Sequence, residues 1–132
     1  MQRSLSVLLP VKNAQSTLNN AVHEILDVMT DSGDRFEVLI IDDGSTDATS
    51  EVAHELTRHY PQIRLVRHGK SRGRDAAIRS GLERSQGEVV MLRDDELGFS
   101  ILERPSRTPS NASSRPARPN YLSRVKKFAI GE

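Results

Sequence analysis

The stretch Val38–Asp47, which reads VLIIDDGSTD, decides the fold of this 132-residue chain. Its four apolar residues predict a short buried strand that ends at the paired acids Asp42 and Asp43. Gly44 and Ser45 are turn residues, and the apolar spacing after them predicts a helix. A strand that ends in carboxylates and turns directly into a helix places those carboxylates at the carboxyl edge of a sheet. Open α/β sheets bind their ligands at this edge.

The first 97 residues alternate between strand and helix patterns. Strands are expected at 5–9, 36–41, 63–66 and 88–92, and amphipathic helices at 18–29, 52–60 and 74–85. Ser16 is the expected N-cap of the first helix, and Gly33 is its expected end. Strict alternation of this kind predicts a three-layer, Rossmann-like α/β fold with a mainly parallel sheet and right-handed crossovers.

Composition limits the classes of function. The chain has no cysteine, which excludes disulfides, thiolate nucleophiles and zinc–thiolate sites. It has no tryptophan and only 4% aromatic residues, so base stacking is poorly supported and no nucleic-acid partner is expected. Its apolar runs are too short for a membrane span or a signal sequence, and we therefore expect a cytoplasmic protein.

Charge and composition divide the chain into three parts. Residues 1–98 carry a net charge of −4 and residues 99–132 a net charge of +5, which together give the formal +1. We expect one folded domain at 1–98, a Pro/Ser/Arg-rich extended or disordered segment at 99–120, and a short basic segment, able to form a helix, at 121–132. The basic tail suggests peripheral contact with a membrane or with an acidic partner.

Acidic residues follow two of the expected strands. Asp42 and Asp43 end the second strand, Asp47 opens the next helix, and the run 94–96 follows the fourth strand. Adjacent carboxylates repel one another, and a hard divalent cation with oxygen ligands relieves that repulsion. A second interpretation stays open at both places. The first three acids also suit a turn and a helix N-terminus, and the run 94–96 suits a solvated acidic turn.

Four blocks of the sequence follow one another in a characteristic order: SVLLPVKN (6–13), EVLIIDDGSTDAT (37–49), RGRDAAIRSGL (72–82) and GEVVMLRDDE (87–96). Together they resemble the family 2 glycosyltransferases of GT-A fold, which include dolichyl- and undecaprenyl-phosphate sugar transferases and many cell-envelope enzymes. The resemblance covers residues 4–97 and implies a GT-A nucleotide-sugar-binding fold, truncated after an Asp-x-Asp-like motif. It also implies transfer of a sugar from a UDP- or GDP-sugar by metal-assisted, inverting chemistry.

The resemblance assigns nucleotide-binding roles to particular residues. Asp43 matches the acceptor of a hydrogen bond from the base, and Asp42 beside it shapes the turn. The loop before the third expected helix would supply cations for the diphosphate, although a solvated basic loop is an equally good interpretation. The nucleotide-binding set is Pro10, Val11, Asn13, Asp42, Asp43, Arg72 and Arg74. The family commonly has Asn in place of Arg72 and a small residue in place of Arg74.

The Asp-x-Asp-like motif implies a site for Mg or Mn. Asp94 matches the first acid, Asp95 the variable middle position, and Glu96 stands where a second Asp is usual. Glutamate still ligates such metals, but its extra methylene moves the carboxylate. Arg93 occupies a position that is apolar in the family, and its guanidinium could pair with an acid and weaken metal binding.

No general base can be assigned from the sequence. After Glu96 the carboxylates are Glu103 and Glu132, whereas family members continue for a hundred residues or more and supply the acceptor pocket and the base there. Three hypotheses follow: a glycosyltransferase completed by dimerisation or a partner chain, a non-catalytic nucleotide or nucleotide-sugar binding module, and a remnant or interaction protein. Uncovered sheet edges and helix faces predict a homo-oligomer, such as a dimer.

Overall fold

The computed structural model describes residues 3–94, 98–102 and 126–127. The elements in chain order are β1 (Ser4–Val11), α1 (Leu18–Ser32), β2 (Arg35–Asp43), α2 (Thr49–His59), β3 (Ile63–His68), α3 (Arg74–Arg84), β4 (Val89–Asp94), β5 (Gly98–Leu102) and β6 (Lys126–Lys127). Each strand and helix expected within the first 97 residues is present.

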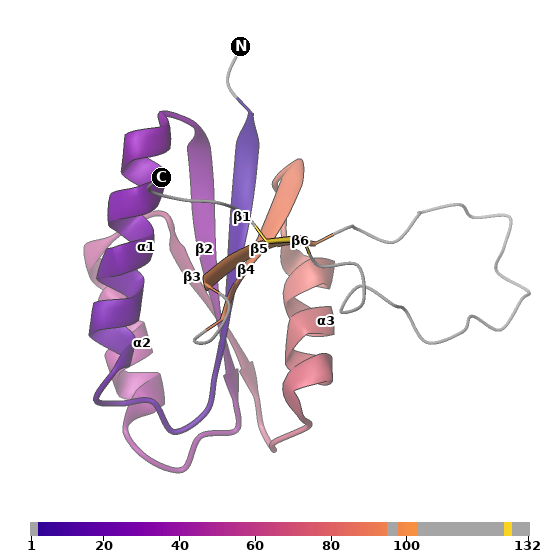
Figure 1. Ribbon diagram of the computed structural model, residues 1–132. Helices are drawn as coiled ribbons and strands as arrows, with labels where there is room; N and C mark the ends of the chain where they lie inside the picture. The colour runs from indigo at the N-terminus through magenta and orange to yellow at the C-terminus, as the bar shows by residue number, and fades with distance from the viewer. Residues whose placement is uncertain (1–2, 95–97, 103–125, 128–132) are drawn as a thin grey trace, which may run out of the picture.

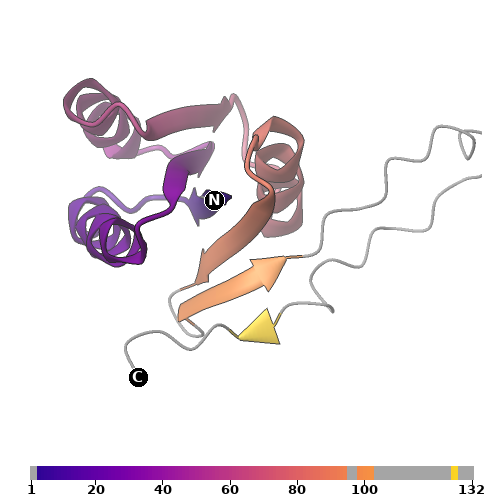
Figure 2. The same cartoon turned by 90° about the horizontal axis from the view of Figure 1, so that it is seen from above.

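The strands form one mixed sheet in the order β3-β2-β1-β4-β5-β6. The strands β1, β2, β3 and β4 are parallel to one another, while β5 pairs antiparallel with both β4 and β6. Helices α1 and α2 cover one face of the sheet and α3 covers the other (Figures 1 and 2). The predicted three-layer α/β fold with a mainly parallel sheet is confirmed.

The core has two sides because successive strand residues point to opposite faces of the sheet. Under α1 and α2, Val7 and Ile40 pack among the buried residues of one cluster. On the other face, Leu8 and Ile41 pack with Ile78 of α3. Residues 38–41 of β2 are completely buried, so both faces of this strand are covered, as its unbroken apolar run predicts. Each such side chain contributes roughly 1.5–3 kcal/mol by leaving water.

The helix α1 stops at Gly33 as expected and begins at Leu18 as expected, but its N-cap lies one residue later than predicted. Gly33 adopts the left-handed conformation, with φ 76°, and its N–H bonds the carbonyl of Thr30. The N-cap is Thr17 instead of Ser16, and its side chain makes no capping hydrogen bond. The reason is a turn at Ala14, whose carbonyl accepts from the N–H groups of Thr17 and Leu18, so the chain is already curved before the helix.

The sheet extends further than the expected domain boundary at residue 98. Gly98, with φ 76°, lets the chain reverse into β5, where Phe99 and Leu102 are buried. In the C-terminal segment, Lys126 and Lys127 pair with β5 as β6, so these two residues lie in a strand and not in a helix. The other residues of the expected tail, 103–125 and 128–132, lie outside the described residues. None of the helices described is long and apolar enough to cross a bilayer.

Candidate functional site at the carboxyl edge of the sheet

The candidate site lies where the strand order reverses. From β1 the chain proceeds outward to β2 and β3 on one side, and β4 then joins β1 on the other side. The carboxyl ends of β1 and β4 therefore flank the topological switch point, which is the position where open α/β sheets bind ligands. Asp42 and Asp43 are the last two residues of β2, and Asp94 is the last residue of β4.

Asp43 is a buried anchor for the loop between β3 and α3. Its Oδ1 accepts from the N–H of Arg72 at 2.8 Å and from His68 Nδ1 at 2.7 Å. Its Oδ2 accepts from Ser71 Oγ at 2.9 Å and from the N–H of Gly73 at 3.0 Å. Burial by itself would raise the pKa of this carboxyl, but the four hydrogen bonds outweigh burial and hold the pKa far below its usual range.

His68 completes this network and was missed in the sequence. It is the last residue of β3, it is buried, and it stands in register with Asp43 across the sheet. Its Nε2 lies 2.8 Å from Ser80 Oγ on α3, so the imidazole connects β2, β3 and α3. The parallel register could have revealed His68, because it sets the last residue of the third strand beside the last residue of the second.

Asp42 shapes the turn that follows β2. The side chain is fully buried, and its Oδ1 accepts from the N–H of Ser45 at 3.1 Å. Its Oδ2 makes no hydrogen bond and lies 3.8 Å from Nε of Arg67. This carboxylate is thus part of the strand end, out of reach of a ligand in solution.

Asn13 joins the loop after β1 to the turn after β2. Its backbone is left-handed, with φ 52°, its N–H donates to Ser45 Oγ at 2.8 Å, and its Oδ1 accepts from the N–H of Thr46 at 2.8 Å. Asp47 holds the start of α2, because its Oδ1 accepts from the N–H of Thr49 at 2.9 Å. The turn and N-terminus interpretation therefore describes Asp47 well. The loop after β1 and the turn after β2, which the hydrogen bonds of Asn13 join, are called the rim below.

Two arginines border a hollow beside this rim. The hollow has a volume of about 470 Å³, within the usual range for ligand pockets. Its lining includes Pro10 and Val11 at the end of β1, Glu24 of α1, Arg74 of α3 and Arg93 of β4. Three residues of the predicted nucleotide-binding set, Pro10, Val11 and Arg74, thus line one hollow.

Each of these arginines has a carboxylate partner. Arg74 is the first residue of α3, and its Nη2 forms an ion pair with Oδ2 of Asp94. Arg93 forms an ion pair with Glu24, donates from Nη1 to the carbonyl of Asp94 at 2.7 Å, and lies 5.7 Å from the centre of the Phe99 ring. Arg93 is therefore held firmly, with its side chain only 12% exposed.

The metal ligands that the resemblance implies are only partly described. Asp94 is placed, and Arg74 engages its carboxylate. Asp95 and Glu96 lie outside the described residues. Within the described ranges, no three His, Asp or Glu side chains come together in a way that could hold a metal ion.

The loop from Gly69 to Gly73 carries two further basic residues, Lys70 and Arg72. Lys12 Nζ donates to Ser71 Oγ at 3.1 Å, which ties the end of β1 to this loop. Arg72 contributes its backbone N–H to Asp43, and its side chain is exposed. The Arg72–Arg74 segment thus connects the acid at the end of β2 to the acid at the end of β4, passing over β1.

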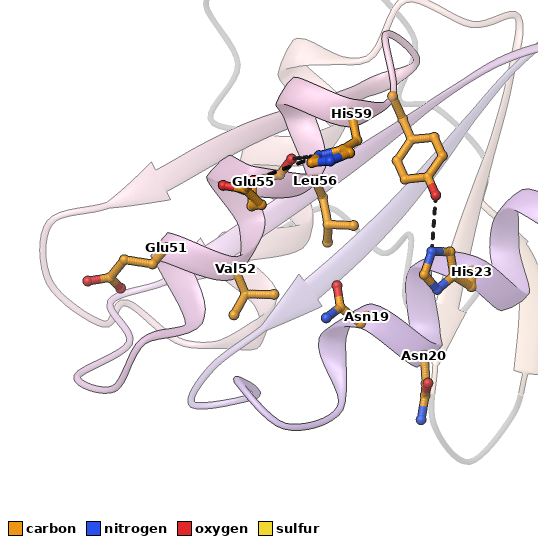
Figure 3. A pocket seen from close by; sticks show the side chains of 9 residues that line it. Asn19, Asn20, His23, Glu51, Val52, Glu55, Leu56 and His59 are labelled. Atoms are coloured by element: carbon orange, nitrogen blue, oxygen red, sulfur yellow. Dashed lines mark hydrogen bonds and ion pairs between the residues drawn. The ribbon is translucent and has the colours of Figure 1, made fainter.

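A larger hollow, of about 610 Å³, lies elsewhere, between α1 and α2 (Figure 3). Both of its histidines have partners within it: His23 Nε2 lies 3.1 Å from the hydroxyl of Tyr60, and His59 Nδ1 lies 3.0 Å from the carbonyl of Glu55. This groove lies between two helices on one face of the sheet, and apart from Asn20 its lining residues differ from those of the hollow at the switch point. We therefore place the candidate site at the sheet edge.

Comparison with known proteins identifies the family. The sequence profile of the family described as Glycosyl transferase family 2 matches residues 6–99. The chain belongs to glycosyl transferase family 2. The expectation from the four sequence blocks is confirmed, and the matched region contains the whole rim and both arginines of the hollow.

Two curated relatives show the degree of similarity. A beta-monoglucosyldiacylglycerol synthase of Synechocystis is 33% identical over 90 residues, which are 67% of this chain and 19% of the relative. The human dolichyl-phosphate beta-glucosyltransferase is 33% identical over 99 residues, or 70% of this chain and 31% of the relative. The chain thus spans less than a third of the length of either enzyme.

Two solved structures share the fold. The mannosyltransferase PcManGT of Pyrobaculum calidifontis, solved in complex with GDP-Man and Mn²⁺, superposes with a TM-score of 0.56 at 23% identity over 81% of this chain and 30% of that one. TarS 1-349 of S. aureus superposes with a TM-score of 0.59 at 19% identity over 85% of this chain and 32% of that one. Both confirm the GT-A type of α/β fold.

Proposed function

We propose that the carboxyl edge of the sheet binds a nucleoside-diphosphate sugar, and that the protein takes part in transferring the sugar from this donor. The observation that carries the proposal is the Arg72–Arg74 segment. Asp43 anchors it through two backbone N–H groups, and it presents arginine side chains and the start of α3 at the switch point. Cations and helix N-termini are the groups that bind phosphates.

Particular residues take different roles in the proposed complex. Pro10 and Val11 line the hollow and offer an apolar wall to the base and ribose. Asn13 holds the rim, and Arg72 offers an exposed guanidinium beside it. Asp43 holds the loop. A carboxylate has about four acceptor positions, and all four on Asp43 are in use, so a base N–H could bond it only by replacing one of the present donors.

Metal-assisted, inverting transfer is the mechanism that the resemblance implies, and PcManGT was solved with Mn²⁺. The described residues of this chain do not fit a divalent cation at Asp94. Its carboxylate already pairs with a guanidinium, and Arg93 contacts the carbonyl of the same residue. A doubly charged cation placed there would be repelled by both arginines. Binding of the donor is therefore proposed here through protein groups.

A non-catalytic nucleotide-binding module is the second candidate. Among the described residues, Glu24 lines the hollow and Asp94 pairs with Arg74, which also lines it, so both of these carboxylates are engaged by arginines and neither is assigned as a general base. Incubation of the full chain with UDP- and GDP-sugars distinguishes the two. Release of nucleoside diphosphate indicates transfer or hydrolysis, whereas binding without release supports the module.

Donor binding predicts a base-selective rise in the melting temperature. In a thermal-shift panel of UDP, GDP, CDP and dTDP, one diphosphate at about a hundredfold excess over its Kd should add about 2.7 kcal/mol of stability, a shift of several degrees. The matching monophosphate should give a smaller shift. Arg72→Ala should reduce the shift, whereas Arg58→Ala, at an exposed site on α2, should not. Equal shifts for all four diphosphates and both variants would argue against the proposed site.

Self-association and a role for the basic tail complete the proposal. Val28, Val89 and Ile101 line a third, largely apolar hollow beside β5, which a second copy of the chain could cover. Light scattering at micromolar concentration should report a dimer, and a clean monomer would contradict self-association.

The basic tail is proposed to contact an anionic membrane surface. Salt-sensitive binding to anionic vesicles, lost on removal of residues 103–132, would test this role. Cytoplasmic localisation stays a prediction.

A further inference from the structure

The two arginines of the hollow differ in what they offer a ligand. The guanidinium of Arg93 is 12% exposed and is held by Glu24 and by the carbonyl of Asp94. The side chain of Arg74 is 48% exposed, and it contacts Asp94 through a single nitrogen, Nη2. A guanidinium has five N–H donors in a planar fork, so Arg74 keeps donors for a second acceptor group. Arg93 is thus held in place at the hollow by its partners, whereas the guanidinium of Arg74 is accessible to a ligand.

The start of α3 adds to the positive potential beside Arg74. The first helical hydrogen bond of α3 runs from the N–H of Ala77 to the carbonyl of Gly73, so the N–H groups of the preceding turn point out of the helix end. Asp75 lies in this first turn and offsets part of the potential. Without a ligand the Arg74–Asp94 and Arg93–Glu24 pairs are neutral. A diphosphate would bring the negative charge and the oxygens that suit a guanidinium and a helix N-terminus.

The divalent cation that the fold family implies would bind at the carboxylate of Asp94, where the guanidinium of Arg74 already lies. Asp94 is the last residue of β4, and its carboxylate orients Arg74 from the neighbouring layer. We propose that Arg74, positioned by Asp94, supplies the positive charge for the diphosphate group, so that this chain binds a nucleoside diphosphate without a divalent metal. The inference rests on the proposed donor binding and specifies how the phosphate end is held.

Isothermal titration of the full chain tests this inference. The probe is the nucleoside diphosphate that gives the largest thermal shift, titrated once in EDTA and once in excess Mn²⁺. We expect the Kd values in the two buffers to agree within about threefold. Arg74→Ala should weaken binding in EDTA at least tenfold, and Arg74→Lys should recover part of the loss. Arg79→Ala removes the same charge from an exposed position on α3 and should leave the Kd within about twofold.

The possible outcomes separate this inference from the proposed function. Binding that requires Mn²⁺ in the wild-type chain, or an unchanged Kd in Arg74→Ala, overturns the role of Arg74 and leaves donor binding intact. Failure of every nucleoside diphosphate to bind in either buffer overturns donor binding and this inference together. The wild-type comparison of the two buffers decides the question even where a variant does not fold.

Discussion

Replacing Asp43 by alanine is expected to lower the free energy of unfolding by about 3 to 5 kcal/mol. The substitution removes a buried carboxylate that accepts four hydrogen bonds, and it leaves His68 Nδ1 and the N–H groups of Arg72 and Gly73 without an acceptor. Urea unfolding followed by circular dichroism measures the change. Asp27→Ala is the matched control, since Asp27 is exposed on α1 and its loss should alter stability by about 0.5 kcal/mol or less.

The lowered pKa of Asp43 also predicts how the stability of the fold changes with pH. Burial raises the pKa of Asp43, but its four hydrogen bonds lower it more, so the folded-state pKa lies below the unfolded one. The carboxylate therefore stabilises the fold above the unfolded pKa, and this contribution is lost as the pH falls below it. Between about pH 5 and pH 2 the wild-type protein should lose stability more steeply than Asp43→Asn. Parallel curves for the two proteins would contradict the anchoring role.

Gly44→Ala is expected to have the second large effect, a loss of about 3 to 4 kcal/mol. Gly44 has φ 70°, and a Cβ there would lie 2.4 Å from the backbone N of Ser71 and 2.8 Å from the backbone C of Lys70. The turn after β2 thus packs directly against the loop that Asp43 anchors. The added methyl group must displace that loop, so nucleoside diphosphate binding should weaken together with stability.

Gly33→Ala measures the cost of a left-handed backbone without the steric contact that a Cβ at Gly44 would make. Gly33 has a similar φ of 76°, but a Cβ at Gly33 meets nothing within 4 Å. We expect a loss of about 1–2 kcal/mol from the left-handed backbone alone, with nucleotide binding unchanged. If chemical denaturation gave equal losses for the two variants, the close approach of Gly44 to the loop would have no energetic importance.

Local patterns were sufficient to predict most of the fold. The unbroken apolar run of β2 predicts a strand buried on both faces, and residues 38–41 are buried completely. The strand β5 was not expected, because the signal at Gly98–Leu102 is only five residues long and borders a Pro-rich stretch. Antiparallel pairing with β4 stabilises this segment, and sequence periodicity does not report such tertiary pairing.

The candidate site was harder to predict, because its contacts join residues that lie far apart in the chain. The carboxyl edge and the turn role of Asp42 followed from the strand–turn pattern. The partners of Asp43 lie 25 to 30 residues away and include two backbone N–H groups, which carry no residue-type signal. The pairing of Arg74 with Asp94 joins the start of α3 to the end of β4, and only the assembled layers bring these two ends together.

The rim at the carboxyl edge is proposed to bind the nucleoside diphosphate of a sugar donor. Two-dimensional ¹⁵N NMR of the full chain, titrated with the diphosphate selected by thermal shift, tests this claim residue by residue. We expect the largest saturable shifts at the amides of Val11–Asn13 and of Gly69–Arg74, with little change at His23 and Tyr60 in the groove between α1 and α2. Shifts confined to that groove, or no saturable shift at either place, would contradict this claim.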